Sequence, residues 1–271
     1  MDGDSFAHRA YHALPKSMRR PDGGPENALV GFTNMLLRLW QDERPRTVLV
    51  AWDTLDVPTY RHTALEAYQS GRVFEADLLE QLDLLPEVVR ATGFAAAKEP
   101  GYEADDFLAA AAAREEAAGG TALVATSDRD AFQLVTPQVT VLQPARGAPP
   151  LRIGPDEVRE RYGVDPAQVP DFIALRGDPS DRIPGARGIG AKRAAELLAQ
   201  YPSLEAMLEA GRFSTEADAL RLYRRIATMD GAAPLPDLPD VAPDWRAAAE
   251  HARALGFERV ASRFDEALTW T

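Results

Sequence analysis

Nine carboxylic acids in this chain occupy positions from which a sheet protein could gather them into one site. Residues 47–52 and 121–126 have the apolar, β-branched character of strands buried on both faces, and acids follow each of them. Ligands of a parallel sheet collect beyond the carboxyl ends of its strands, and the remaining acids flank turns or loops. The complete set is Asp2, Asp53, Glu103, Asp105, Asp106, Asp128, Asp130, Asp178 and Asp181.

So many acids share a pocket only when cations offset their mutual repulsion. Because the chain has no cysteine and four histidines, a metal would be held by oxygen, and hard oxygen ligands favour Mg²⁺ or Mn²⁺. Two such ions about 4 Å apart can activate a water and stabilise the leaving oxygen of a phosphodiester. The acids therefore predict a nuclease. Glu103, Asp105 and Asp106 have an alternative role, which is to complement the dipole at a helix start.

A glycine-rich stretch at residues 174–198 predicts a second kind of binding. Its glycines clear side chains from a tight turn, so that backbone N–H groups at the start of the next helix can face a phosphate. Basic residues flank the turn, and the apolar Ile189 would hold the two helices together. The pattern indicates a helix-hairpin-helix clamp on a nucleic-acid backbone, and a helical turn with solvated charges is the alternative. The clamp residues are Arg182, Gly185, Arg187, Gly188, Ile189, Gly190, Lys192 and Arg193.

The acidic net charge of the chain is compatible with a nucleic-acid partner because of where the acids lie. The 271 residues carry 42 acids and 30 Lys or Arg, a formal net charge of −12, whereas nucleic-acid binders are expected to be basic. Without the nine acids above, 33 acids would face 30 basic residues. No apolar run reaches membrane-spanning length, so we expect no membrane contact and a cytoplasmic location.

Alternation of strand and helix patterns predicts an α/β fold with a mostly parallel sheet flanked by helices. A third strand is expected at 139–142, a helix at 26–43 precedes the first strand, and a helix at 78–92 lies between the first strand and the second. Beyond residue 150 the pattern is helical. Helices are predicted there at 155–162, 166–175, 191–200, 203–210, 216–229 and 244–268.

Three regions follow from this pattern. Residues 1–150 would form the α/β core, and residues 151–230 a helical lobe that carries the hairpin. Residues 231–271 would add a strap and a C-terminal helix. The strap has four prolines within 231–243, which exclude a helix or a central strand.

The ordered motifs resemble the 5′-nuclease family, which includes the 5′-3′ exonuclease domain of bacterial DNA polymerase I and the flap endonucleases. The resemblance covers about residues 2–230, and no polymerase sequence follows, so we expect a stand-alone enzyme of the bacterial cytoplasm or nucleoid. It implies a PIN-like α/β nuclease core and a helical DNA-binding lobe. The matching segments are DGDSFAHRAYHAL, WDTLDVPTYRH, YQSGR, GYEADDFLA, TSDRDAFQL and RGDPSDRIPGARGIGAKRA.

The resemblance also implies roles for individual residues. Arg9 would approach the substrate phosphates, residues 60–85 would form an arch over single-stranded 5′ ends, and the hairpin would grip the duplex with a monovalent cation such as K⁺. Two divalent ions would be bound or oriented by the acids. The resemblance assigns two sets of acids to these ions: Asp2, Asp53, Glu103, Asp105 and Asp106 to the first, and Asp128, Asp130, Asp178 and Asp181 to the second.

Gln69 departs from the family pattern. The arch of the family usually carries a lysine here, whose cation can meet the scissile phosphate, whereas glutamine donates a hydrogen bond without charge. Arg72 or Arg61 could compensate, and the neighbouring Tyr68 could either stack on a base or lie in the core. We expect that a lysine at position 69 would raise the cleavage rate.

Asp2 also departs from the family pattern, because the family's aspartate at this position normally follows an apolar strand of several residues. Here only Met1 precedes it, and a buried strand is typically about five residues long. We therefore expect a frayed start, with an α-amino charge that competes with metal for Asp2, and a natural product that begins several residues upstream. The alternative is that another segment fills the gap.

These features favour a metal-dependent, structure-specific 5′-nuclease in DNA replication or repair, which acts as a monomer on DNA with 5′ ends, flaps or junctions. A non-catalytic junction binder with the same fold is the alternative, and Gln69 and the missing strand favour it. A nuclease that acts on RNA is a third hypothesis, because nothing in the sequence excludes an RNA strand.

Overall fold

The computed structural model describes residues 1–70 and 73–270, and the chain folds into two units that are each discontinuous in sequence. The first unit contains residues 1–53, 73–99 and 234–271, and the second contains residues 54–72 and 100–233. Arg72, which the sequence analysis assigns to catalysis, lies outside the described residues. The nine acids are divided, since Asp2 and Asp53 belong to the first unit and the other acids to the second.

The first unit holds a two-stranded parallel sheet. β1 (Leu49–Ala51) pairs with β2 (Ala95–Ala97), so that Leu49 lies opposite Ala95 and Ala51 opposite Ala97. β1 confirms the strand predicted at 47–52. The sequence contains no strand signal for β2, because alanine is depleted in strands, and β2 is defined by its pairing with β1.

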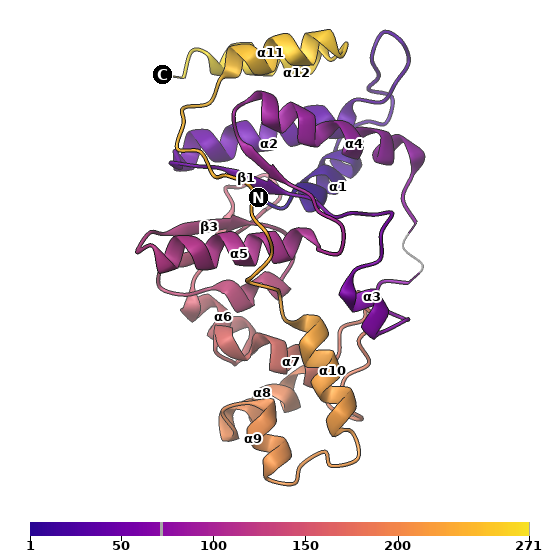
Figure 1. Ribbon diagram of the computed structural model, residues 1–271, viewed down its shortest axis with the longest axis vertical. Coiled ribbons are helices and arrows are strands. Elements are labelled where there is room, and N and C mark those ends of the chain that lie inside the picture. Colours follow the sequence, from indigo (N-terminus) through magenta and orange to yellow (C-terminus); the bar gives the residue numbers. More distant parts are fainter. Residues whose placement is uncertain (71–72, 271) are drawn as a thin grey trace. The chain divides into compact units, whose positions relative to one another are not determined.

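Five helices of the first unit surround an apolar core. α1 packs on α2, α11 packs on α4, and α12 packs on α2. The sequence predicts one helical region at 244–268, whereas the structure divides it into α11 and α12, which pack against each other and are joined through Gly256 at a φ of 79°. Both helices are labelled in Figure 1. Glycine adopts that left-handed conformation without steric cost. The helices are α1 (Gly3–Ala13), α2 (Asn27–Glu43), α4 (Ala76–Ala91), α11 (Trp245–Ala254) and α12 (Glu258–Ala267).

The chain start is ordered rather than frayed. The backbone N–H of Ala51 donates to the Met1 carbonyl at 2.9 Å, and Asp2 forms a parallel bridge with Ala51. The α-amino group donates to the Leu49 carbonyl at 2.8 Å, and burial lowers its pKa to about 6. The expectation of a frayed Asp2 beside a charged amino group is therefore wrong for this structure.

The predicted arch at 60–85 is wrong in its second half. Residues from 76 onward form α4, whose Leu78 and Leu82 are buried and which packs against α1 and α2. On the exposed side of α4, Asp77 pairs at 2.5 Å with Arg19, which lies between α1 and α2. The first half contains the short helix α3 (Tyr60–Ala64) followed by turns.

The second unit holds a mixed three-stranded sheet. β3 (Ala122–Ala125) and β4 (Val139–Gln143) are parallel, as predicted, and β5 (Leu151–Ile153) adds an antiparallel edge. β5 is not predicted, because a three-residue edge strand is too short for an alternating pattern. The expected α/β class with a mostly parallel sheet is confirmed.

The helices of the second unit follow the predicted ranges closely. α6 and α8 have the predicted bounds, and α9 begins where the Ser203 hydroxyl accepts a hydrogen bond from the N–H of Ala206. Such N-caps satisfy donors that the helix itself leaves unpaired. Figure 1 labels the helices of this unit. Besides α3, they are α5 (Ala104–Ala117), α6 (Pro155–Tyr162), α7 (Val169–Arg176), α8 (Ala191–Gln200), α9 (Leu204–Glu209) and α10 (Ala217–Ala227), with 3₁₀ turns η1 (Asp130–Leu134) and η2 (Pro166–Gln168).

Residues 231–243 contain neither helix nor strand, in agreement with the proline-rich strap that the sequence predicts. At its end the N–H of Asp244 donates to the Thr92 carbonyl at 2.9 Å. Among the helices of the described residues, none combines the length and the apolar character needed to cross a bilayer.

Candidate active site

Asp2, Asp4 and Asp53 lie together in the first unit. Asp2 caps α1, because its Oδ1 accepts a hydrogen bond from the N–H of Ser5 at 2.9 Å. Asp53 follows β1, and its N–H donates to Oδ2 of Asp4 at 2.7 Å. Burial, followed by the charges of Asp53 and Asp2, raises the pKa of Asp4 well above its ordinary value. The sequence analysis missed Asp4, although it is only two residues from Asp2 and is a third acid in this group.

Gly3 is required for this arrangement. A Cβ at position 3 would lie 2.4 Å from the nearest ring atom of Trp52, the residue before Asp53. Any side chain there would push α1 away from the end of β1. The glycine between Asp2 and Asp4 therefore allows these acids to approach Asp53.

The acids of the α5 start form a capping box. Glu103 is the N-cap residue, and its N–H donates to Oδ2 of Asp106 at 3.1 Å. Asp105 lies in the same first turn and is partly exposed. These positions agree with the helix-dipole role that the sequence left open for all three acids.

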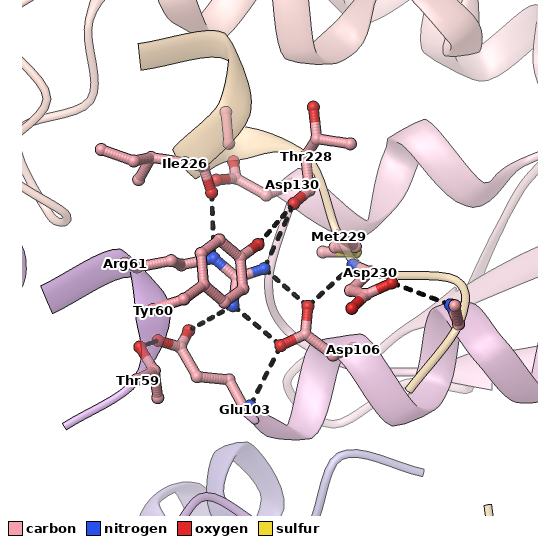
Figure 2. A network of polar contacts seen from close by, with 12 residues as sticks. Thr59, Tyr60, Arg61, Glu103, Asp106, Asp130, Ile226, Thr228, Met229 and Asp230 are labelled. Atoms are coloured by element: carbon pink, nitrogen blue, oxygen red, sulfur yellow. Dashed lines mark hydrogen bonds and ion pairs between the residues drawn. The ribbon is translucent and has the colours of Figure 1, made fainter. Parts of the chain in front are cut away.

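Asp106 is saturated with hydrogen bonds, as Figure 2 shows. Its two oxygens accept both terminal nitrogens of Arg61, at 2.8 and 2.6 Å, as well as the N–H groups of Glu103 and Asp230. A carboxylate offers about four lone-pair positions, and here four donors occupy them in a side chain that is 0% exposed. The sequence predicts that Asp106 binds or orients the first metal ion, and that assignment stays a prediction. The geometry favours an orienting role, because direct binding of an ion would displace one of these four donors.

Arg61 is buried with its partners, because its side chain is 3% exposed. Its Nε donates to the Ile226 carbonyl at 2.9 Å, and a terminal nitrogen lies 3.6 Å from Glu103. Burial disfavours the charge, but the hydrogen bonds with Asp106 and the charge of Glu103 outweigh it and raise the pKa of Arg61. The predicted contact of Arg61 with DNA, and its role as a substitute cation at the phosphate, are contradicted by this burial.

Glu103 accepts hydroxyl donors on both oxygens. The Thr59 hydroxyl donates to Oε1 and the Tyr68 hydroxyl to Oε2, each at 3.0 Å. Tyr68 is 3% exposed and packs edge-on against His62, so the core alternative holds and the predicted stacking on a base does not. Burial and the charge of Glu103 raise the pKa of Tyr68, which keeps its hydroxyl protonated as a donor.

A second group of acids lies after β3 and before the hairpin. Oδ1 of Asp128 accepts the N–H of Asp130 at 2.8 Å, and Oδ1 of Asp178 accepts the N–H and the hydroxyl of Ser180. Burial, and then the charges of Asp128, Asp178 and Asp181, raise the pKa of Asp130 well above its ordinary value. The structure thus brings together the four acids that the sequence assigns to one ion.

Gln69 contacts this second group. Its side-chain amide donates to Oδ1 of Asp181 at 3.2 Å and to the Tyr68 hydroxyl at 2.9 Å. Its predicted role as a donor to the substrate phosphate stays a prediction, since the amide is engaged with protein groups here. Arg9, the other predicted substrate contact, lies on α1 and is partly exposed.

The donor set fits a hard divalent cation in its chemistry. All the candidate ligands are carboxylates, and crowding of three acids around Asp130 is the condition that a cation relieves. Within the described residues, no three Asp, Glu or His side chains converge closely enough to enclose a metal ion by themselves.

The predicted hairpin lies between α7 and α8. Asp178 and Ile183 exchange two backbone hydrogen bonds of 2.8 Å, and Gly185 passes so close to Gly177 that a Cβ would lie 2.4 Å from the Gly177 nitrogen. Gly185 also has a φ of 77°, so both its size and its conformation require glycine.

The outer part of the hairpin is open. No described atom lies within 4 Å of a Cβ placed on Gly188 or Gly190, and Gly190 is the N-cap of α8 without a side-chain hydrogen bond. Ile189 is partly buried, and Arg182, Arg187 and Lys192 are exposed. Arg193 pairs with Glu196 at 2.9 Å. The assignment of these residues to DNA binding stays a prediction.

Two protein-family models match consecutive parts of the chain. The 5′-3′ exonuclease N-terminal resolvase-like domain matches residues 1–163, and the 5′-3′ exonuclease C-terminal SAM fold matches residues 164–245. The chain belongs to the 5′-3′ exonuclease family. Its fold is accordingly a resolvase-like PIN domain followed by a helical SAM-like fold, as the sequence motifs predict.

DNA polymerases I are among the similar sequences. The chain is 44% identical to DNA polymerase I of Mycobacterium bovis over 212 residues, and 41% identical to the thermostable enzyme of Thermus thermophilus over 210 residues. Each match covers 77% of this chain, but only 23% and 24% of the respective polymerase. The chain therefore corresponds to about a quarter of these relatives.

Solved structures share the fold over nearly the whole chain. T5 5′-exonuclease with bound zinc has a TM-score of 0.68 at 18% identity and covers 98% of this chain and 96% of its own. The catalytic core of Rad2 in complex with DNA substrate has a TM-score of 0.60 at 15% identity, with 98% and 89% covered. Human GEN1 in complex with Holliday junction DNA has a TM-score of 0.63 at 14% identity, with 99% and 71% covered.

Proposed function

We propose that this protein is a metal-dependent, structure-specific 5′-nuclease that hydrolyses DNA phosphodiesters as an exonuclease and flap endonuclease in DNA replication or repair. Membership of the 5′-3′ exonuclease family supports the reaction. The observation that carries the proposal is that Asp130 is buried near Asp128, Asp178 and Asp181, whose charges disfavour its ionised form, because a bound cation would relieve this repulsion.

Two Mg²⁺ or Mn²⁺ ions would supply charge to activate a water and to stabilise the leaving oxygen. Asp128, Asp130, Asp178 and Asp181 are the proposed ligands of one ion. For the other, Asp2, Asp53, Glu103 and Asp105 remain the assignment from sequence. Asp106 would act by holding the start of α5 in place.

DNA is the proposed partner. Relatives of this chain are DNA polymerases, and structures with its fold were solved with substrate or junction DNA. The open Gly188–Gly190 turn and the exposed Arg187 and Lys192 suit a duplex phosphate backbone, with K⁺ as the proposed monovalent ion of the hairpin. A monomer would suffice for this binding.

Cleavage of a 5′-labelled flap tests the proposal. We expect release of 5′-end products that depends on Mg²⁺ and is lost in Asp178→Ala and in the isosteric Asp130→Asn. Asp83→Ala is the matched control, because this acid is 81% exposed on α4. Tight flap binding without cleavage in the unmodified protein would instead support the non-catalytic junction binder, which the glutamine at position 69 favours.

A further inference from the structure

The segment from Thr59 to Gln69 forms hydrogen bonds with acids from two different parts of the second unit. At its start, Thr59 donates to Glu103 of the α5 start. At its end, Gln69 donates to Asp181 of the loop before the hairpin. One short segment therefore contacts Glu103 and Asp181, which lie 78 positions apart in sequence.

Tyr68 joins these two contacts. Its hydroxyl donates to Oε2 of Glu103 at 3.0 Å and accepts the amide of Gln69 at 2.9 Å. The same amide donates to Oδ1 of Asp181 at 3.2 Å. An unbroken series of hydrogen bonds thus runs from Glu103 through Tyr68 and Gln69 to Asp181. Because Tyr68 is 3% exposed, the surrounding core fixes the position of its hydroxyl.

Gln69 has an unusual backbone conformation. Its φ is 48°, in the left-handed region that side chains other than glycine rarely adopt. Its N–H also approaches the Asp181 carbonyl at 3.4 Å. A strained residue persists when its surroundings determine its conformation, and such residues cluster at functional sites.

Arg61 anchors the same segment (Figure 2). Its two terminal nitrogens hold Asp106, and its Nε holds the carbonyl of Ile226 at the end of α10. The bidentate geometry fixes direction as well as distance. The segment is therefore tied to α5 and α10 before Tyr68 and Gln69 reach the acids.

We propose that Tyr68 is a positioning residue that, through its hydroxyl and with Gln69, holds the carboxylates of Glu103 and Asp181 ready for divalent cations. The proposal rests on the proposed function, in which these carboxylates are metal ligands. Outer groups that orient metal ligands typically change metal affinity by about 10- to 100-fold when they are lost. Gln69 suits this role because its neutral amide joins the Tyr68 hydroxyl to Asp181 without bringing a positive charge that would repel the cation.

The test compares two tyrosine-to-phenylalanine substitutions in one segment. Tyr68→Phe removes only the hydroxyl between Glu103 and Gln69. Tyr60→Phe removes a hydroxyl whose hydrogen bond goes to a backbone group, the Thr228 carbonyl at 3.1 Å, so it is the matched control. Mn²⁺ binding to the DNA-free protein is measured by calorimetry, flap cleavage is measured across Mg²⁺ concentrations, and thermal melting in EDTA checks the fold.

We expect Tyr68→Phe to weaken Mn²⁺ binding by about tenfold and to raise the half-saturating Mg²⁺ concentration similarly, with a cleavage rate at saturation within about threefold of the unmodified protein. Tyr60→Phe should change neither metal value. Unchanged Mn²⁺ binding in Tyr68→Phe, or equal losses in both variants, would overturn the proposal. Failure of the unmodified protein to cleave, with Mn²⁺ binding still weakened by Tyr68→Phe, would sink the proposed function and leave the positioning role standing.

Discussion

Asp106 and Asp130 are both aspartates at the start of a helical turn in the second unit, yet they lie in opposite electrostatic environments. Asp106 is fully buried and compensated by the buried guanidinium of Arg61. Burial, and then the charges of Asp128, Asp178 and Asp181, raise the pKa of Asp130, and the charge of Arg176 offsets only part of this effect. Residue type alone does not identify a metal ligand. An acid whose charge is already compensated supports the structure, whereas an acid with unrelieved repulsion is prepared for a cation.

The largest expected effect is the loss of turnover when Asp130, the acid with three acidic neighbours, is replaced. Asp130→Asn keeps the shape of the side chain but removes a ligand charge, and metal-ion stabilisation of a phosphoryl transition state is worth several kcal/mol. We expect flap cleavage to fall by roughly 10³-fold or more, with duplex binding nearly intact. Single-turnover rates and fluorescence anisotropy measure the two quantities. Equal losses of rate and affinity would contradict the separation of the acids from the hairpin.

Substitution of Asp106, the acid whose charge is compensated, should change the stability of the protein rather than turnover. Asp106→Ala takes from the buried Arg61 both of its short carboxylate hydrogen bonds and leaves it only the more distant Glu103, at 3.6 Å. Breaking a buried ion pair in this way costs about 3–5 kcal/mol of unfolding free energy. Urea denaturation measures the loss. Asp156→Ala breaks an exposed pair with Arg159, whose distance is 2.8 Å, and should change stability little. Similar stability in both variants would mean that the Arg61 network contributes nothing special.

The contrast between Asp106 and Asp130 could not be predicted from the sequence. Both follow motif positions, and the sequence correctly predicts that acids gather after β3 and before the hairpin. Arg61 lies 45 positions before Asp106 and 165 before Ile226, and no local pattern reports such distant partners. The same limit applies to Tyr68 and Arg61. Tyrosine can stack on a base and arginine can pair with a phosphate, so the sequence suggests DNA contacts for both residues, and only the structure shows that they are buried.

Parts of the fold were predictable where periodicity is long. α8 matches its predicted bounds because its buried Ala194, Leu197 and Leu198 recur at helical spacing. α6 matches because it begins at Pro155 and ends before Gly163, which has a φ of 70°. β2 and β5 have three residues each, too few to show a period, and their pairing partners define them. Residues 76–85 were assigned to an arch by resemblance, but their own buried leucines already fit a core helix.

Gln69 donates a hydrogen bond to Asp181, one of the acids around Asp130, and its replacement by lysine should separate two effects. A cation near the reacting phosphate can be worth on the order of 10²-fold, so we expect Gln69→Lys to cleave faster at saturating Mg²⁺. The ammonium would also lie where the amide now meets Asp181, so the half-saturating Mg²⁺ concentration should rise. Gln69→Met, which lacks both amide and charge, should show only the second effect. An unchanged rate at saturation in Gln69→Lys would show that another cation already serves the phosphate.

Crowding at Asp130 should also appear as a pH dependence of stability in metal-free protein. Its pKa is raised in the folded state, so the folded form holds the proton more tightly than the unfolded chain, whose aspartates titrate near about 3.9. The stability from this group is fully present below that value and is lost as the pH rises through the higher folded-state pKa. In EDTA, Asp130→Asn should therefore melt at a higher temperature than the unmodified protein at pH 7, with a smaller difference at pH 4. A lower melting temperature at pH 7 would show that Asp130 is compensated like Asp106.

The same contrast between compensated and uncompensated charge applies, with the smallest effect, to two neighbouring cations of the hairpin. Arg193 pairs with Glu196 at 2.9 Å, whereas exposed Lys192 forms no ion pair among the described residues. Each phosphate contact releases about one counterion, so Lys192→Ala should lower the slope of log affinity against log salt by about one. Arg193→Ala should lower the slope by less, because its charge is already shared with a carboxylate. Duplex binding measured between about 50 and 200 mM salt decides the comparison, since electrostatic binding changes steeply over that range. Equal slopes for both variants would show that DNA displaces Glu196 from Arg193, and that charge compensation in the free protein does not predict which cations grip the backbone.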